Sequence, residues 1–444
     1  MLKAPMNERL VRVERGTPMG EAFRRFWLPV CQLKDLHPGG APLEVRLLGE
    51  DLLAFRGPEG DAGVVDRFCA HRGADLRYAR NEVGGLRCIF HGWKYAGDGR
   101  CVEIPNVPEG DRICPRVKIR SYPVESKGGL LWCYMGPPEQ LPPFPVLAWM
   151  SKGEAHWSGT FVQVESEGNY LQHIEGLCDG SHVGFLHANL QGGGGGSRFV
   201  QSAAFSDRTP QWAYLEDTSY GAALAMERDA GAGKRNLRLN QFLLPFSVEV
   251  PTPPPYAVSS WQTNIPMDDE RTMFLYTSWY DPEPVEELRA RVGDRSYEIP
   301  ALQPGSYKPV LNRSNAYGQD RGEFMQRQSF SGMRNLRLED MAVAEYVRGG
   351  LVADRSAETL VSSDLAIVKV RARLLALADK LEQQGHLREE TMAVASHRIV
   401  PAEMDIEPGE DVAQRCRSAG VSKVELDREF AVAPARLDST DRFV

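Results

Sequence analysis

The chain has 444 residues with a formal net charge of -8, and 42% of its residues are hydrophobic and 25% charged. These values are typical of a globular enzyme with two or three domains. The acidic balance and the lack of a basic run argue against a nucleic-acid-binding or lipid-binding protein. No stretch fits a signal peptide or a membrane span, so we expect a cytoplasmic protein.

Residues 1–28 are predicted to form one or two short helices. Apolar positions recur from Leu10 to Phe23 and are interrupted by Gly16, Thr17 and Pro18, a pattern typical of helices separated by a turn. We expect this segment to pack outside the domain that follows it.

Residues 29–142 are predicted to form an all-β domain. The runs 44–48 and 52–55 flank Gly49 and predict a hairpin, and further strand-like runs flank the turns at 97–99 and 127–129. The proline-rich stretch 136–145 cannot continue a strand or a helix, so we place the domain boundary there.

Two Cys/His pairs lie in this domain, Cys69 with His71 and Cys88 with His91. A zinc ion and a Rieske [2Fe–2S] cluster are the two candidates for such a set. Structural zinc sites usually pair like with like, whereas each pair here mixes one cysteine with one histidine. In a Rieske centre two histidines replace two cysteines on one iron, so each loop gives one ligand to each iron. The spacing therefore favours the Rieske arrangement, and the other six cysteines are expected to be reduced thiols.

Residues 143–385 are predicted to form a larger domain, an antiparallel sheet covered by helices, which gives the whole chain an α+β fold class. Helices are predicted over 169–186, 341–347 and 364–383. Five consecutive glycines at 192–196 indicate a flexible loop or a lid, and residues 386–444 form a C-terminal extension without an assigned function. The predicted strands are 159–165, 211–216, 237–244, 256–265 and 272–280.

A second candidate metal site follows the spacing ExxxDxxHxxxxH, with Glu175, Asp179, His182 and His187. Two histidines and one carboxylate on one face, with open positions, bind iron in non-haem Fe(II) oxygenases. On a straight helix His182 and His187 would lie about 140° apart and could not share one metal. Either the helix ends or bulges near Gly184, or these residues bind no metal.

The segments 69–73 and 88–95 resemble the Rieske family, in its ferredoxin and oxygenase branch. The segment 169–187 resembles the catalytic motif of Rieske non-haem iron ring-hydroxylating oxygenases, most closely the phthalate dioxygenase-like branch. The resemblance covers most of residues 7–375. It implies an oxygenase (alpha) component of aromatic catabolism that contains a Rieske [2Fe–2S] cluster and a mononuclear non-haem Fe(II).

The resemblance also implies the ligands of that iron. His182 and His187 correspond to the two histidine ligands, and Asp340 in the stretch 338–345 corresponds to the carboxylate ligand. Glu339 and Glu345 are the alternatives to Asp340.

A further implied role belongs to Asp179, which would bridge to a cluster ligand, His91, of a neighbouring subunit and pass electrons to the iron. The family suggests a homotrimer or a hexamer. The chain carries no dinucleotide or nucleotide motif, so electrons are expected from a separate NAD(P)H-dependent reductase that contains flavin or ferredoxin groups.

The substrate remains open within this resemblance, because the branch acts on aromatic carboxylates and on methoxylated aromatics. Cis-dihydroxylation and O-demethylation or monooxygenation are both compatible with it, and the rival function is a Rieske electron-transfer protein without mononuclear iron. A carboxylate requires a buried guanidinium, for which Arg228 and Arg238 are the main candidates, with Arg235 as a third. Aromatic candidates for the pocket are Phe185, Phe242, Phe246, Trp261 and Phe274.

Overall fold

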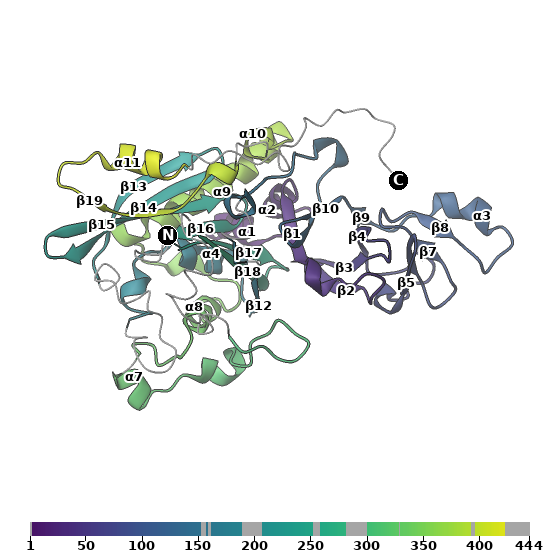
Figure 1. Ribbon diagram of the computed structural model, residues 1–444, viewed down its shortest axis with the longest axis horizontal. Coiled ribbons are helices and arrows are strands. Elements are labelled where there is room, and N and C mark those ends of the chain that lie inside the picture. The colour runs from purple at the N-terminus through teal and green to yellow at the C-terminus, as the bar shows by residue number, and fades with distance from the viewer. Residues whose placement is uncertain are drawn as a thin grey trace.

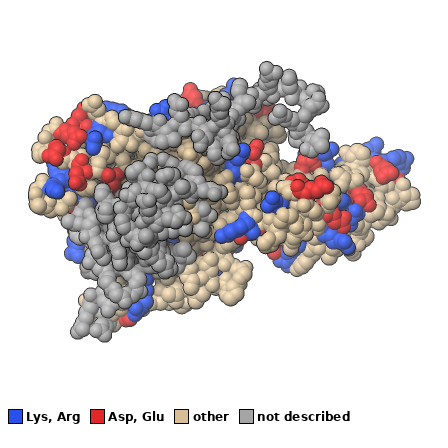
Figure 2. Space-filling view, viewed as in Figure 1, with Lys and Arg blue, Asp and Glu red and all other residues tan. Residues whose placement is uncertain are grey.

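The computed structural model describes residues 2–151, 157–158, 161–188, 207–251, 258–280, 300–327, 329–391 and 396–421. Short strands form one end of the molecule, and a large sheet with its helices forms the other (Figure 1). The predicted α+β class is confirmed, whereas the predicted domain limits at 28, 142 and 385 stay predictions. Within the described residues, no helix has the length and apolar character needed to cross a membrane. The face in Figure 2 mixes basic and acidic side chains over its described surface.

The first 23 residues contain two helices, α1 (Ala4–Val11) and α2 (Pro18–Phe23). The hydroxyl of Thr17 caps α2 by accepting a bond from the backbone N–H of Gly20. Both helices contact α9 (Leu365–Gln384) of the larger part of the molecule. The buried guanidinium of Arg24 donates to the Leu48 carbonyl at 2.9 Å, so this segment also contacts the smaller part.

The smaller part consists of antiparallel strands in three sheets, with the orders β1-β11-β10, β2-β3-β4-β9 and β5-β6-β7-β8. The predicted hairpin is confirmed as β2 and β3, whose turn places Leu48 and Gly49 at positive φ. The strand bounds are β1 (Trp27–Gln32), β2 (Leu43–Leu47), β3 (Glu50–Arg56), β4 (Ala62–Asp66), β5 (Arg80–Glu82), β6 (Gly85–Arg87), β7 (Lys94–Tyr95), β8 (Cys101–Glu103), β9 (Ser121–Tyr122), β10 (Val124–Lys127) and β11 (Leu130–Tyr134).

The larger part is built on an antiparallel sheet of eight strands in the order β12-β18-β17-β16-β15-β14-β13, with β19 paired to β15. The five predicted strands are confirmed, but β14, β16 and β19 were not predicted. The bounds are β12 (Val162–Glu167), β13 (Gln211–Thr218), β14 (Gly221–Gly231), β15 (Lys234–Leu243), β16 (Ser247–Pro251), β17 (Val258–Pro266), β18 (Arg271–Tyr280) and β19 (Ala402–Ile406).

Two helices that contact each other, α4 (Tyr170–Cys178) and α8 (Leu336–Glu345), position the site. The prediction of one helix over 169–186 is wrong, because α4 ends at Cys178 and Asp179 takes an extended conformation (φ -80°, ψ 112°). Helix α8 begins earlier than predicted because the Asn335 side chain accepts from the N–H of Leu338 and caps it. The other α-helices of the described residues are α3 (Gly110–Ile113), α7 (Glu323–Arg327), α10 (Arg388–Thr391) and α11 (Val412–Ala419).

The C-terminal extension contributes structure up to residue 421. Strand β19 lies beside β15, and α11 packs against β13 and β19. The glycine run at 192–196 and the end of the chain after residue 421 lie outside the described residues.

Candidate active site

The two Cys/His pairs lie on two loops that share one backbone pattern. In each loop the N–H of the cysteine, Cys69 or Cys88, donates to the carbonyl five residues later, at 2.9 Å and 2.8 Å. The glycine four residues on, Gly73 or Gly92, returns a bond to the cysteine carbonyl at 2.9 Å and 3.0 Å. Both glycines have positive φ (66° and 77°), which side chains rarely adopt. We call the two loops, residues 69–73 and 88–92, the cluster loops; they carry Cys69, His71, Cys88 and His91.

The side chains of the cluster loops fit a [2Fe–2S] cluster. The two cysteines are each 3% exposed, whereas His71 and His91 are half-buried. The centroids of the two histidine rings lie 4.5 Å apart. The Nδ1 atom of His91 is buried and has no hydrogen-bond partner among the described residues, as expected of a nitrogen that binds a metal. The Tyr95 hydroxyl lies 3.1 Å from the Cys69 sulfur and accepts from the N–H of Ala70.

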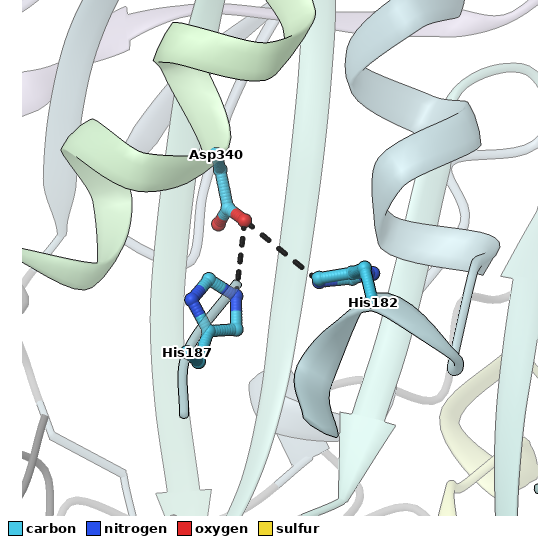
Figure 3. Close-up of side chains that lie close together, drawn as sticks. All are labelled: His182, His187 and Asp340. Atoms are coloured by element: carbon cyan, nitrogen blue, oxygen red, sulfur yellow. Dashed lines mark ion pairs between the residues drawn. The ribbon is translucent and has the colours of Figure 1, made fainter. Parts of the chain in front are cut away.

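His182, His187 and Asp340 come together beside α4 and α8 (Figure 3). Their candidate ligand atoms all lie within 4.8 Å of one another. One oxygen of Asp340 is 3.1 Å from Nε2 of His187 and 3.9 Å from Nε2 of His182. Two imidazoles and one carboxylate that converge from one side fit a facial triad for non-haem iron. We call these three residues the triad.

The end of α4 makes the triad possible, because the two histidines are not on one helix. His182 lies in a short 3₁₀ turn (His182–Gly184), and His187 follows it. The break that the sequence required is therefore present, but it lies at Cys178 and not near Gly184. The triad thus combines a loop after α4 with one residue of α8 (Figure 3).

A buried carboxylate lies behind His187. Glu339 Oε2 is 2.6 Å from His187 Nδ1, and its other oxygen accepts from the Ser331 hydroxyl. Since an ionised carboxylate only accepts, Nδ1 of His187 donates its proton to Glu339, and Nε2 faces Asp340. Burial lowers the pKa of His187, but Asp340 and Glu339 outweigh it and raise it to about 10. Glu339 therefore lies on the Nδ1 side of His187, away from Asp340, and Glu345 accepts from the Tyr317 hydroxyl.

Asp179 lies behind the other histidine. Its Oδ1 accepts from the N–H and the hydroxyl of Ser181, each at 2.7 Å. Its Oδ2 is 3.5 Å from His182 Nδ1. Burial raises the pKa of Asp179, but the contacts with His182 and Ser181 bring it below its ordinary value. Each histidine of the triad therefore has a carboxylate on its Nδ1 side.

Glu175 does not join the triad. Its carboxylate accepts from Arg371 at 2.6 Å and from the fully buried Arg355 at 3.0 Å. Because Arg371 belongs to α9, this contact fixes α4 against α9 and so positions the loop that carries His182.

A cavity of about 470 Å³ adjoins the triad and is lined by α4, α8 and the six neighbouring strands β12, β18, β17, β16, β15 and β14. Arg228 on β14 and Arg238 on β15 both line it, as the carboxylate hypothesis requires. Arg238 pairs with Glu403 of β19 at 2.8 Å. The third candidate, Arg235, is exposed, pairs with Glu227 and is not among the lining residues.

Of the five aromatic candidates, Phe274 lines the cavity. Phe242, Phe246 and Trp261 belong to the main hydrophobic core, and Phe185 is exposed beside Phe330.

Sequence reasoning missed two further cavity residues, His173 on α4 and Arg337 on α8. Arg337 lies three positions before Asp340, so helical spacing could have placed it on the same face. The signal for His173 was weaker, because a lone histidine in a helix is usually structural.

Comparison with known proteins gives two family models, the Rieske [2Fe-2S] domain over residues 26–123 and the LigXa C-terminal domain-like model over residues 133–424. The chain is 35% identical over 384 residues to the phthalate 4,5-dioxygenase oxygenase subunit of Pseudomonas putida, covering 84% of this chain and 86% of the relative. It is 40% identical over 196 residues to the 5,5'-dehydrodivanillate O-demethylase oxygenase subunit of a Sphingobium species, covering 43% and 44%. The solved structure of dicamba monooxygenase bound to dicamba has a TM-score of 0.57 at 17% identity, covering 82% of this chain and 99% of that one.

The contact behind His187 yields a test. In Glu339→Gln the ring loses its anionic partner, so the affinity of the triad for Fe(II) should fall about 10- to 100-fold. Anaerobic metal titration measures this, and the absorption of the cluster checks that the protein is folded. Glu345→Gln is the matched control and should bind metal like the parent. Equal affinity in Glu339→Gln and the parent would contradict the orienting role of Glu339.

Proposed function

Since the chain belongs to the Rieske non-haem iron oxygenases, as their terminal oxygenase component, we propose that the triad holds its mononuclear iron and the cluster loops hold its [2Fe–2S] cluster. When bound, the iron supplies the reaction with O₂ and the cluster supplies single electrons. The convergence of both Nε2 atoms on one oxygen of Asp340, beside a cavity large enough for an aromatic ring, carries this proposal.

As an oxygenase component, the chain takes its electrons from a separate reductase or ferredoxin. We propose that this partner is NAD(P)H-dependent and that electrons then pass between two copies of the chain. Within one copy, the strands next to the cluster loops, β4 to β7, and helix α4 lie in different parts of the molecule (Figure 1). A path between neighbouring copies avoids that separation, which favours a closed homotrimer or a hexamer of two such rings.

The surface around His91 supports contact with another copy. Ile89 and Phe90, which precede His91, are 64% and 55% exposed, and Phe68 on the other loop is also exposed. Contiguous exposed apolar side chains are typical of interaction surfaces. At the other end of the proposed path, Asp179 and His182 retain partial exposure in the single chain. We propose that the partner subunit's His91 docks against Asp179.

The chain's own residues then divide the work. Asp179 holds its carboxylate 3.5 Å from His182 Nδ1 and offers it to the partner's His91, so it lies between two imidazole rings across the interface. Glu339 holds the His187 ring from behind in the same way. Together the two carboxylates orient both rings so that their Nε2 atoms are directed into the site.

We propose that the substrate is an aromatic carboxylate, held by Arg228. This residue is buried, lines the cavity and donates to the Gly180 carbonyl at 2.9 Å, in the loop that leads to His182. Burial lowers the pKa of Arg228 to about 10, so the guanidinium is still charged at neutral pH. We propose cis-dihydroxylation of the ring, supported by the phthalate relative that matches 84% of the chain. O-demethylation is the second candidate, because the dehydrodivanillate relative is 40% identical over its matched part.

Arg228→Met tests the carboxylate hypothesis. The apparent KM for aromatic carboxylates should rise about 10- to 100-fold with a smaller change in kcat, because a charged hydrogen bond common to substrate and transition state is lost. Steady-state O₂ uptake with product analysis measures this, and formaldehyde release identifies O-demethylation. Arg235→Met, on the same hairpin but outside the cavity, is the control. If both variants behave like the parent enzyme, Arg228 does not bind the carboxylate.

Asp179→Asn tests the electron path. The variant should keep its iron and the spectrum of its cluster, yet reoxidation of the reduced cluster by O₂ and substrate should slow at least about 10-fold, since the bridging charge is lost. Stopped-flow absorption at the cluster bands follows this step. Asp217→Asn, exposed on β13, removes a carboxylate far from the path and should react at the parental rate. Normal turnover of Asp179→Asn with the native reductase would rule out the path.

A further inference from the structure

The cavity has a second cationic end, far from Arg228. Its wall runs from β14, which carries Arg228, to β18, which carries Phe274. Four strand spacings separate β14 from β18 in the sheet order, or roughly 19 Å between strand axes. Arg337 of α8 lies at the β18 end, with its guanidinium carbon 3.6 Å from the centroid of the Phe274 ring.

Arg337 is buried, and no acidic side chain of the described residues forms an ion pair with it. It is 5% exposed, and its Nε and Nη2 atoms have no hydrogen-bond partner among the described residues. The acids whose charges act most strongly on Arg337 are Asp340 and Glu345. Asp340 is directed at the histidines of the triad, and Glu345 accepts from the Tyr317 hydroxyl. Neither forms an ion pair with Arg337 in the described part of the chain.

His173 of α4 shares this end of the cavity. It is 4% exposed, and neither ring nitrogen has a well-aligned hydrogen-bond partner among the described residues, although the backbone of Glu167 approaches the ring. Burial and the charge of Arg337 lower its pKa to about 3, so the ring is neutral and has one N–H to donate. His173 Nε2 lies beside Gly168, directly after β12, and β12 pairs with β18. The helices α4 and α8 contact each other, so both residues face the same end of the cavity. We call these two residues the Arg337–His173 niche.

Unsatisfied buried donors are costly, about 1–3 kcal/mol for a neutral group and more for a charged one. Two of them facing one cavity therefore indicate a ligand that satisfies both. A carboxylate fits, because its two oxygens match the guanidinium fork and one of them can also accept from an imidazole. The stacking of Arg337 on Phe274 fixes the plane of the fork before the ligand arrives.

We propose that the Arg337–His173 niche binds a second acidic group of the substrate, so that the enzyme prefers elongated aromatic diacids over monoacids. This inference rests on the proposed function, because it places the substrate in the same cavity. Arg228 would bind one acidic group and the niche the other, with the aromatic body held between them beside the triad.

Calorimetric binding to the full-length, cluster-containing protein under anaerobic conditions tests the niche with two probes. Biphenyl-4-carboxylate and biphenyl-4,4'-dicarboxylate share one apolar body and differ by one carboxylate. The parent protein should bind the diacid about 10- to 100-fold more tightly, as expected for one charge-assisted bidentate contact. Arg337→Met keeps an apolar stem on Phe274 and should abolish this preference without weakening the monoacid.

Two further variants keep the test decisive. His173→Phe should reduce the preference roughly fivefold, as for one neutral hydrogen bond, and covers the case in which Arg337→Met does not fold. Arg334→Met removes an exposed charge that pairs with Asp320 outside the cavity and should keep the full preference. The proposal is wrong if the parent protein shows no preference for the diacid. It is also wrong if the preference persists in both Arg337→Met and His173→Phe.

Iron content, measured on the same samples, separates this inference from the proposed function. If the chain holds only the iron of its cluster while Arg337 still controls the diacid preference, the proposed function fails and the niche stands. If the mononuclear iron is present but the preference does not depend on Arg337, the niche alone is wrong.

Discussion

The site depends on where helix α4 ends. An extended backbone at Asp179 terminates the helix, so His182 and His187 leave the helical spacing that would hold them about 140° apart. The same residue then lies with its carboxylate behind His182, while Glu339 of α8 lies behind His187. The end of α4 at Asp179 therefore allows both histidines to lie beside Asp340. Asp179 is also one of the two carboxylates that lie behind the histidine rings.

Acidic side chains surround this centre. Three acids, Asp179, Glu339 and Asp340, surround two imidazoles, and α4 itself is fixed from outside by the contacts of Glu175 with Arg355 and Arg371. On the sheet side, Arg238 is paired with Glu403, which comes from a strand beyond residue 386. The end of the chain thus helps to set the electrostatics of the cavity, although its sequence suggested no role.

Local patterns in the sequence were sufficient to predict the Rieske domain, because each loop contains its cysteine, its histidine and its glycine within five residues. The resemblance supplied the long-range partner Asp340, which no periodicity could connect to His182. Strand β14 was missed because its alanine-rich, continuously buried run lacks alternation, and β19 because its polar residues become a strand only by pairing with β15. The orienting role of Glu339 and the isolation of Arg337 depend on tertiary contacts, so they could be found only in the folded chain.

The central claim is that one chain holds two separate iron sites. Anaerobic iron and acid-labile sulfide analysis, with electron paramagnetic resonance of the dithionite-reduced protein, tests it most directly when the parent and His182→Ala are compared. The account predicts about three irons and two sulfides per chain, with one iron lost and an unchanged Rieske signal in the variant. About two irons in both proteins would contradict it and leave a Rieske electron carrier.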